Sequence, residues 1–103
     1  MFVVIFITAK DASEAERIGR ALVEKKLVAC TNVIAGITSF FRWEGKVDAS
    51  DEALLILKTK KSLFKKVEKA VKALHSYNVP EIIALPIVAG SKDYLRWVDE
   101  SVR

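Results

Sequence analysis

The segment that decides the fold is Phe2-Val-Val-Ile-Phe-Ile-Thr-Ala9, near the start of the chain. Its side chains are apolar as far as Thr8, and they are β-branched or aromatic, which favours a strand over a helix. A continuous apolar run of this kind indicates burial on both faces, so we expect this strand to be central in a sheet. No basic residues precede the run, so we interpret it as part of the domain and not as a signal peptide.

A helix is predicted directly after this strand. Asp11 is a suitable N-cap, and Glu14 three residues later would complete a capping box. The helix is expected to run to about Lys26 with one apolar stripe facing the core. The residues expected to face water are Glu14, Glu16, Arg17, Arg20, Glu24, Lys25 and Lys26.

The next thirty residues predict a long β-hairpin. The stretch from Val28 to Trp43 is rich in β-branched and aromatic residues, and Gly36 in its middle indicates a bulge or bend. Glu44-Gly45 marks the turn. The chain then returns through a polar arm into a second apolar strand, residues 53–57.

The last part of the chain predicts a helix, a strand and a short helix. Residues 63–74 place apolar side chains at 3.6-residue spacing, and this helix must end before Pro80. Residues 82–88 are predicted to form a strand in which Pro86 indicates an edge position or a bulge, and Ser91 is suited to cap a final helix. The order is β-α-β-β-α-β with one extra helix. We therefore predict an α+β fold, a ferredoxin-like sandwich in a single domain spanning residues 1–103.

This fold places both main helices on one face of the sheet. The other face is predicted to be apolar, because the first strand is apolar throughout and Phe40, Phe41 and Trp43 add to it. The final helix is expected to cover part of this face. Neighbouring copies of the chain are the natural cover for the rest, so an oligomer is predicted.

Composition narrows the possible functions. The chain has 103 residues, of which 51% are hydrophobic and 29% charged, with a net charge of +4. A single cysteine, Cys30, permits no internal disulfide and fits a reducing compartment. No apolar run approaches a membrane span, and no CxxC, HExxH, GxSxG or glycine-rich phosphate loop is present. These absences weigh against a closed zinc site within one chain and against an enzyme.

Two places in the sequence carry side chains suited to ligand binding. The segment from His75 to Glu81 gathers an imidazole, the Tyr77 phenol and a carboxylate in one loop. From spacing alone, a helix-capping role for His75 and a packing role for Tyr77 are favoured. Cys30 has the soft thiolate ligand that copper(I) prefers, or it is a small buried side chain.

Two charged clusters have simpler interpretations. Asp48, Asp51 and Glu52 could hold a hard divalent cation, but a solvated hairpin arm is favoured. The second helix has a basic face, which we interpret as solvated and not as a nucleic-acid surface, since no RNA-recognition signature is present. The lysines on or just before that helix are Lys60, Lys61, Lys65, Lys66, Lys69 and Lys72.

Five separated motifs resemble the CutA family of divalent-cation tolerance proteins over essentially the whole chain. They are Ala29-Cys-Thr-Asn32, Phe41-Arg-Trp-Glu-Gly45, Leu57-Lys-Thr59, His75-Ser-Tyr-Asn-Val-Pro-Glu-Ile82 and Tyr94-Leu-Arg-Trp97. The positions that match the family's motifs are Cys30, Asn32, Trp43, Gly45, Lys58, His75, Tyr77, Pro80 and Glu81. Two departures stand out: Ser76 replaces a usual proline, and Phe41 replaces a frequent tyrosine.

The resemblance implies a cytoplasmic homotrimer, similar to the PII signalling proteins, that is linked to tolerance of copper and other divalent cations. It implies no enzymatic activity and no required cofactor. Cys30 and His75 are the candidate metal ligands, with three copies of the chain supplying a ligand number that one lacks.

Two alternatives stay open. The first is a PII-like protein that binds a small anion in clefts between subunits. The candidate cleft residues are Asn32, Trp43, Lys58, Tyr77 and Glu81, with Lys58 holding the anion. The second is a structural trimer that binds another protein. Neither alternative involves a membrane or nucleic acid.

Overall fold

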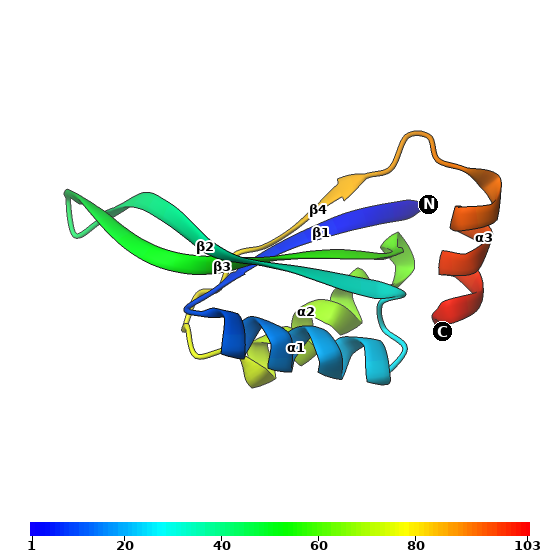
Figure 1. Ribbon diagram of the computed structural model, residues 1–103, viewed down its shortest axis with the longest axis horizontal. Helices are drawn as coiled ribbons and strands as arrows, with labels where there is room; N and C mark the ends of the chain where they lie inside the picture. Colours follow the sequence, from blue (N-terminus) through cyan, green and yellow to red (C-terminus); the bar gives the residue numbers. More distant parts are fainter.

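The computed structural model describes residues 1–103, and its elements follow the predicted order (Figure 1). The strands are β1 (Phe2–Ala9), β2 (Cys30–Trp43), β3 (Lys46–Lys60) and β4 (Ile82–Pro86). The helices are α1 (Ala12–Glu24), α2 (Phe64–Leu74) and α3 (Lys92–Ser101), with a 3₁₀ turn, η1 (Lys61–Leu63), before α2. The βαββαβ prediction with an extra C-terminal helix is confirmed. None of the three helices has the length and apolar composition needed to cross a membrane.

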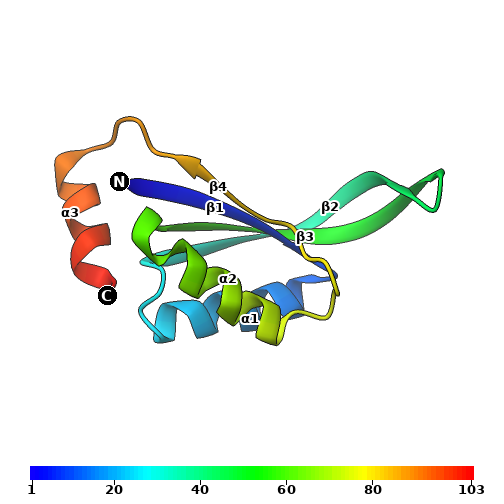
Figure 2. The ribbon, with the colours of Figure 1, turned by 180° about the vertical axis from the view of Figure 1, so that it is seen from behind.

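The four strands form one antiparallel sheet in the order β2-β3-β1-β4. β1 is central, as predicted, and pairs with β3 from Phe2↔Lys60 to Ala9↔Ala53. α1 and α2 lie side by side on one face of the sheet in both views (Figure 2). β4 lies at an edge, where the missing N–H of Pro86 costs no ladder hydrogen bond.

The prediction that β1 is buried on both faces is wrong for the single chain. Its side chains alternate between buried and half-buried along the whole strand. Ile5 and Ile7 point toward the helices and are fully buried, whereas Val4 and Phe6 point to the opposite face. The reason is that the helices cover only one face of the sheet.

The face of the sheet opposite the helices, here called the open face, is apolar. On this face, Ile34, Ile83 and Leu85 are 46%, 48% and 44% exposed to solvent. The strand register adds four side chains to them: Val4, Phe6, Leu54 and Ile56. α3 stands beside the end of the sheet where β1 begins, so it covers only that end of the open face (Figure 1).

β2 and β3 form the long hairpin that projects from the body of the molecule (Figure 1). Glu44 and Gly45 both have positive φ, 51° and 77°, as the two central residues of a type I′ turn require. The register slips between Ile34 and Ile37, where Gly36 has φ 74°, so the predicted bulge is confirmed.

Two capping predictions need correction. The Asp11 side chain caps α1 by accepting from the Glu14 N–H at 2.8 Å, but the Glu14 carboxylate accepts from the Lys10 N–H and not from that of Asp11. Ser91 makes no capping bond with its side chain, and the first turn of α3 is closed instead by the Leu95 N–H to the Ser91 carbonyl at 2.9 Å.

Candidate functional site

The structure places the predicted site residues in separate regions. Cys30, Asn32 and Lys58 lie together on the open face near α3, because Cys30 and Lys58 are cross-strand partners. Trp43, Tyr77 and Glu81 lie away from that end: Trp43 is next to the hairpin turn, and all three line one hollow between the hairpin and the loop of Tyr77 and Glu81. One chain therefore does not bring the five candidate cleft residues together, and the cleft between subunits expected from the sequence would have to combine residues of different copies.

Cys30 is half-buried and has two polar neighbours. Its Sγ lies 3.7 Å from the Tyr94 hydroxyl oxygen, within hydrogen-bond reach for sulfur. Burial, and then the hydrogen bond with Cys30, raise the pKa of Tyr94. Lys58, across the strand, donates its ammonium to the Asn32 side-chain oxygen. Cys30 is thus a thiol at the sheet surface, beside a phenol that stays protonated at neutral pH.

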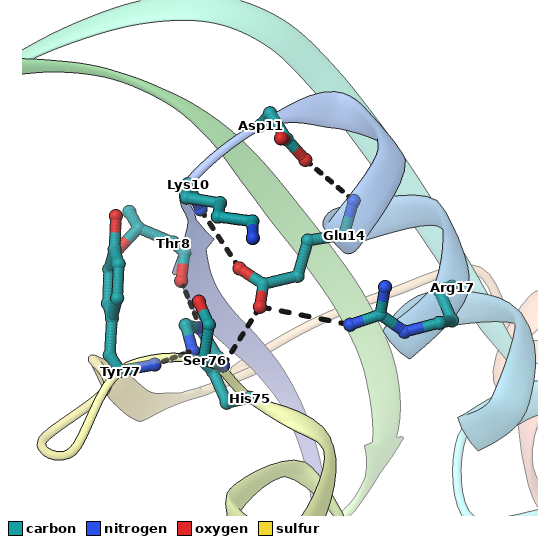
Figure 3. A network of polar contacts seen from close by, with 8 residues as sticks. All are labelled: Thr8, Lys10, Asp11, Glu14, Arg17, His75, Ser76 and Tyr77. Atoms are coloured by element: carbon teal, nitrogen blue, oxygen red, sulfur yellow. Dashed lines mark hydrogen bonds and ion pairs between the residues drawn. The ribbon is translucent and has the colours of Figure 1, made fainter.

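His75 follows α2 and is held through both ring nitrogens (Figure 3). Its Nδ1 accepts from the Tyr77 backbone N–H at 3.0 Å, and its Nε2 lies 2.7 Å from the Thr8 carbonyl oxygen. A carbonyl only accepts, so Nε2 carries the hydrogen and the ring is neutral. A metal ion at His75 would have to displace one of these two partners. The imidazole does not cap the helix, since its bonds lead to β1 and to the following loop.

Glu14, predicted to face water, is buried with 1% of its surface exposed. Its carboxylate accepts hydrogen bonds from the Lys10 N–H at 3.1 Å and the Ser76 N–H at 2.9 Å, and the Arg17 guanidinium is 3.9 Å away (Figure 3). Burial alone would raise its pKa, but the bonds from Ser76 and Lys10 outweigh burial and lower it.

Sequence reasoning missed this bond from Ser76 to Glu14, which fixes the loop that follows α2. The signal available was Ser76 itself, which departs from the proline that the resemblance implies at this position. Proline has no N–H to donate, so only a residue other than proline can make the observed bond to Glu14.

A hollow of about 870 Å³ lies between the hairpin and the loop of residues 77–81. We call it the hairpin hollow. Its acidic lining residues are Asp48, Glu52 and Glu81, and none of its twelve lining residues is Lys, Arg or His. Asp51 belongs to the same sequence cluster but not to this lining, because alternate residues of a strand point to opposite faces.

The remaining lining includes the aromatic residues Phe40, Phe41, Trp43 and Tyr77. The side chains of Phe41 and Trp43 lie on the hairpin face that carries Asp48 and Glu52, whereas that of Phe40, which pairs with Ala49, lies on the opposite face. The Tyr77 hydroxyl donates to Glu52 Oε2 at 2.7 Å. Burial first, and then this bond, raise the pKa of Tyr77 far above its usual value of 10, so the phenol stays a hydrogen-bond donor.

No three His, Cys, Asp or Glu side chains of this chain come close enough together to hold a metal ion. Cys30 and His75, the two predicted ligands, are among the residues that the single chain does not unite. The strand register explains this. Cys30 pairs with Lys58 of β3, which pairs in turn with Val4 near the start of β1. His75 instead contacts Thr8 near the opposite end of β1.

Comparisons with known proteins agree with one another. Residues 3–101 match the family described as CutA1 divalent ion tolerance protein. The divalent-cation tolerance protein CutA of Archaeoglobus fulgidus is 51% identical over 98 residues, which is 95% of each chain. The solved structure of the divalent cation tolerance protein from Thermus thermophilus superimposes with a TM-score of 0.98 at 46% identity, and each chain is covered completely. The A. fulgidus structure, described as a periplasmic divalent cation tolerance protein, gives 0.97 at 50% identity, again over all of both chains.

Proposed function

This chain belongs to the CutA1 divalent ion tolerance protein family, and on that premise we propose that it is a cytoplasmic homotrimer that takes part in tolerance of copper and other divalent cations. The family is not known as a family of enzymes. The observation that carries the proposal is the match over nearly the whole chain to relatives described as divalent-cation tolerance proteins. The A. fulgidus relative is described as periplasmic, so cell fractionation is the test of the cytoplasmic location.

The apolar open face supports the proposal of an oligomer. Ile34, Ile83 and Leu85 come from strands at both edges of the sheet and are almost half exposed in the single chain. Contiguous apolar surface of this kind is uncommon on monomers and is typical of interfaces between subunits. A cyclic trimer would bury the open face of each copy against its neighbours.

Cys30 is the preferred metal ligand in this proposal. A thiolate suits copper(I), and Cys30 lies on the open face, where residues of a neighbouring subunit would approach it. His75 is the second candidate, because its ring nitrogens already have the Thr8 and Tyr77 backbone groups as partners. Since one chain groups no three ligands, the site would use several subunits.

The decisive experiment combines light scattering with a copper(I) competition titration against bicinchoninate. We expect a trimer mass with and without copper, and we expect Cys30→Ser to lose most of the copper affinity. His75→Gln is the matched comparison and should retain that affinity. Unchanged copper binding by Cys30→Ser would refute Cys30 as the ligand, and a monomer mass would refute the trimer and the shared site together.

A further inference from the structure

The open face is charged at both ends and apolar between them. Along β3 every second side chain points to this face, while the alternate side chains are buried against the helices. The side chains on the open face are, in order, Glu52, Leu54, Ile56, Lys58 and Lys60. The open face therefore has an acidic end near the hairpin and a basic end near α3.

The acidic end carries one carboxylate that the chain leaves without a partner. Glu81, directly before β4, lines the hairpin hollow together with Glu52 and Asp48. Glu52 accepts the Tyr77 hydroxyl at 2.7 Å, and Asp48 accepts the Ala49 N–H at 2.8 Å. Glu81 takes part in none of the four ion pairs within the chain, so its carboxylate is free to accept a cation from another molecule.

The basic end carries one ammonium group that lacks an anionic partner. Lys60 is neutralised by Asp99 of α3, with Nζ 2.8 Å from the carboxylate oxygen. Lys58 instead donates to the side-chain oxygen of Asn32, which is neutral. When a neighbouring copy covers the open face, Lys58 loses its contact with water, and a covered charge with only a neutral acceptor is costly. The assembled protein therefore requires an anion at Lys58.

The acidic end of the same copy is too far away to supply that anion. Lys58 and Glu52 are six residues apart on β3, which is about 20 Å at a rise of about 3.4 Å per residue. Lys58 is aligned through Val4 with Leu85 of β4, and Glu81 is four residues further along that strand direction. Both separations exceed the combined reach of a lysine and a glutamate side chain, so the anion comes from a second molecule.

A second copy of the chain supplies the anion when the copies pack head to tail. A cyclic assembly joins two different patches of each copy, and here the two ends of the open face have opposite charge. Contact between like ends would instead bring carboxylates together or ammonium groups together. We propose that Lys58 of each copy forms an ion pair with Glu81 of the neighbouring copy, so that each interface holds one such pair. The pairing rests on the proposed trimer and defines the direction in which its copies follow one another.

Charge exchange between the two positions tests the pairing. Lys58→Glu and Glu81→Lys are made alone and together, and light scattering follows the mass through a urea series at fixed chain concentration. Urea carries no charge, so it does not screen the pair as a salt would. Each single variant should raise the dissociation constant of the trimer at least about a hundredfold, because like charges then meet in a covered place. The paired variant should recover most of the wild-type stability of the trimer, because the opposite charges are restored.

Matched variants control for net charge and for folding. Lys65→Glu and Glu16→Lys make the same charge changes at exposed positions of the helical layer and should leave the dissociation constant unchanged. Lys58→Met and Glu81→Gln, alone and together, repeat the test without introducing a charge. Their effects should be less than additive, because either change alone already breaks the same pair.

The outcomes separate this pairing from the proposed trimer. A monomer mass for the wild type would refute both. A wild-type trimer whose single variants dissociate like the wild type, or whose exchanged pair is no more stable than the single variants, would overturn the pairing and leave the trimer intact. Phosphate that stabilises the wild type but not Lys58→Met would assign Lys58 to a free anion, and that result would also overturn the pairing.

Discussion

The Ser76 backbone N–H donates to Glu14 Oε2 at 2.9 Å, across 62 positions of sequence, and joins the loop after α2 to the first turn of α1. Because the Glu14 carboxylate has no contact with solvent, this bond is one of the few ways in which its charge is compensated. The same loop carries Tyr77 to the hairpin hollow. The bond therefore links the stability of the helical layer to the shape of the candidate site.

Replacing Ser76 with proline should destabilise the protein, because it removes the N–H that Glu14 accepts. The expected loss in unfolding free energy is about 1–3 kcal/mol, the cost of leaving a buried acceptor short of a partner. His75 has φ −81° and ψ 141°, which a following proline tolerates, so the residue before the substitution adds no strain. Ser76→Ala keeps the N–H and serves as the control. Denaturant unfolding at a fixed protein concentration measures both, and equal stability of the two variants would contradict the role of the bond.

Because of Glu14, the free energy of unfolding should vary with pH in the acid range. Its pKa is lowered from the usual 4.5, so the folded state favours the ionised form. The stabilisation is therefore complete above pH 4.5 and is lost as the pH falls through the lower folded value. Glu14→Gln should lower the free energy of unfolding at about pH 7. The difference in unfolding free energy between wild type and variant should become smaller in acid, below the usual pKa of 4.5. Exposed Glu16→Gln should show neither effect, and a gap that widens in acid would refute the assignment.

His75 should be neutral with its proton on Nε2. The Tyr77 N–H occupies Nδ1, and the Thr8 carbonyl requires a donor. The chain has a single histidine, so long-range ¹H–¹⁵N correlation spectra at neutral pH show its ring nitrogens without ambiguity. We expect one protonated and one bare nitrogen, with the bare one assigned to Nδ1. The opposite tautomer would contradict the described loop geometry.

Gly19→Ala should destabilise the protein although alanine is the better helix former. A Cβ on Gly19 would lie 2.5 Å from Thr31 Cγ2, closer than atoms can pack. The strain is expected to exceed the gain in helix propensity of about 1 kcal/mol. Adding Thr31→Ser removes the methyl group and keeps the hydroxyl, which donates to the Gly19 carbonyl. Thermal unfolding should therefore show recovery in the double variant, and no recovery would mean that another contact is responsible.

Ile83→Lys should dissociate the proposed trimer, because it places a charge in the middle of the open face. Ile83 is paired with Phe6 in the central part of the sheet and is 48% exposed in the single chain. Val88→Lys is the matched control at a position that is 94% exposed beyond the end of β4. Light scattering should give a smaller mass for Ile83→Lys alone. A full trimer mass for Ile83→Lys would show that the open face is not the interface.

Much of the fold could be predicted from local patterns. The apolar run from Phe2 to Ala9 indicated the central strand, and the 3.6-residue spacing before Leu74 indicated α2. Glu44-Gly45 and Pro86 identified the hairpin turn and an edge strand. These features depend on the backbone preferences of individual residues and on the spacing of apolar side chains, and both can be recognised in a short stretch of sequence.

Only the tertiary structure decided how the candidate site residues are grouped. Cys30 and His75 stand out equally in the sequence, but the register of β1 and β3 carries them to different regions. Glu14 looks like a surface residue of an amphipathic helix until Ser76 is brought to it. By itself, the sequence determined the elements and their order, because those follow from local propensity and periodicity. The burial of Glu14, the neutral state of His75 and the acidic aromatic hollow depend on contacts between residues far apart along the chain, and only the packed sheet and helices create those contacts.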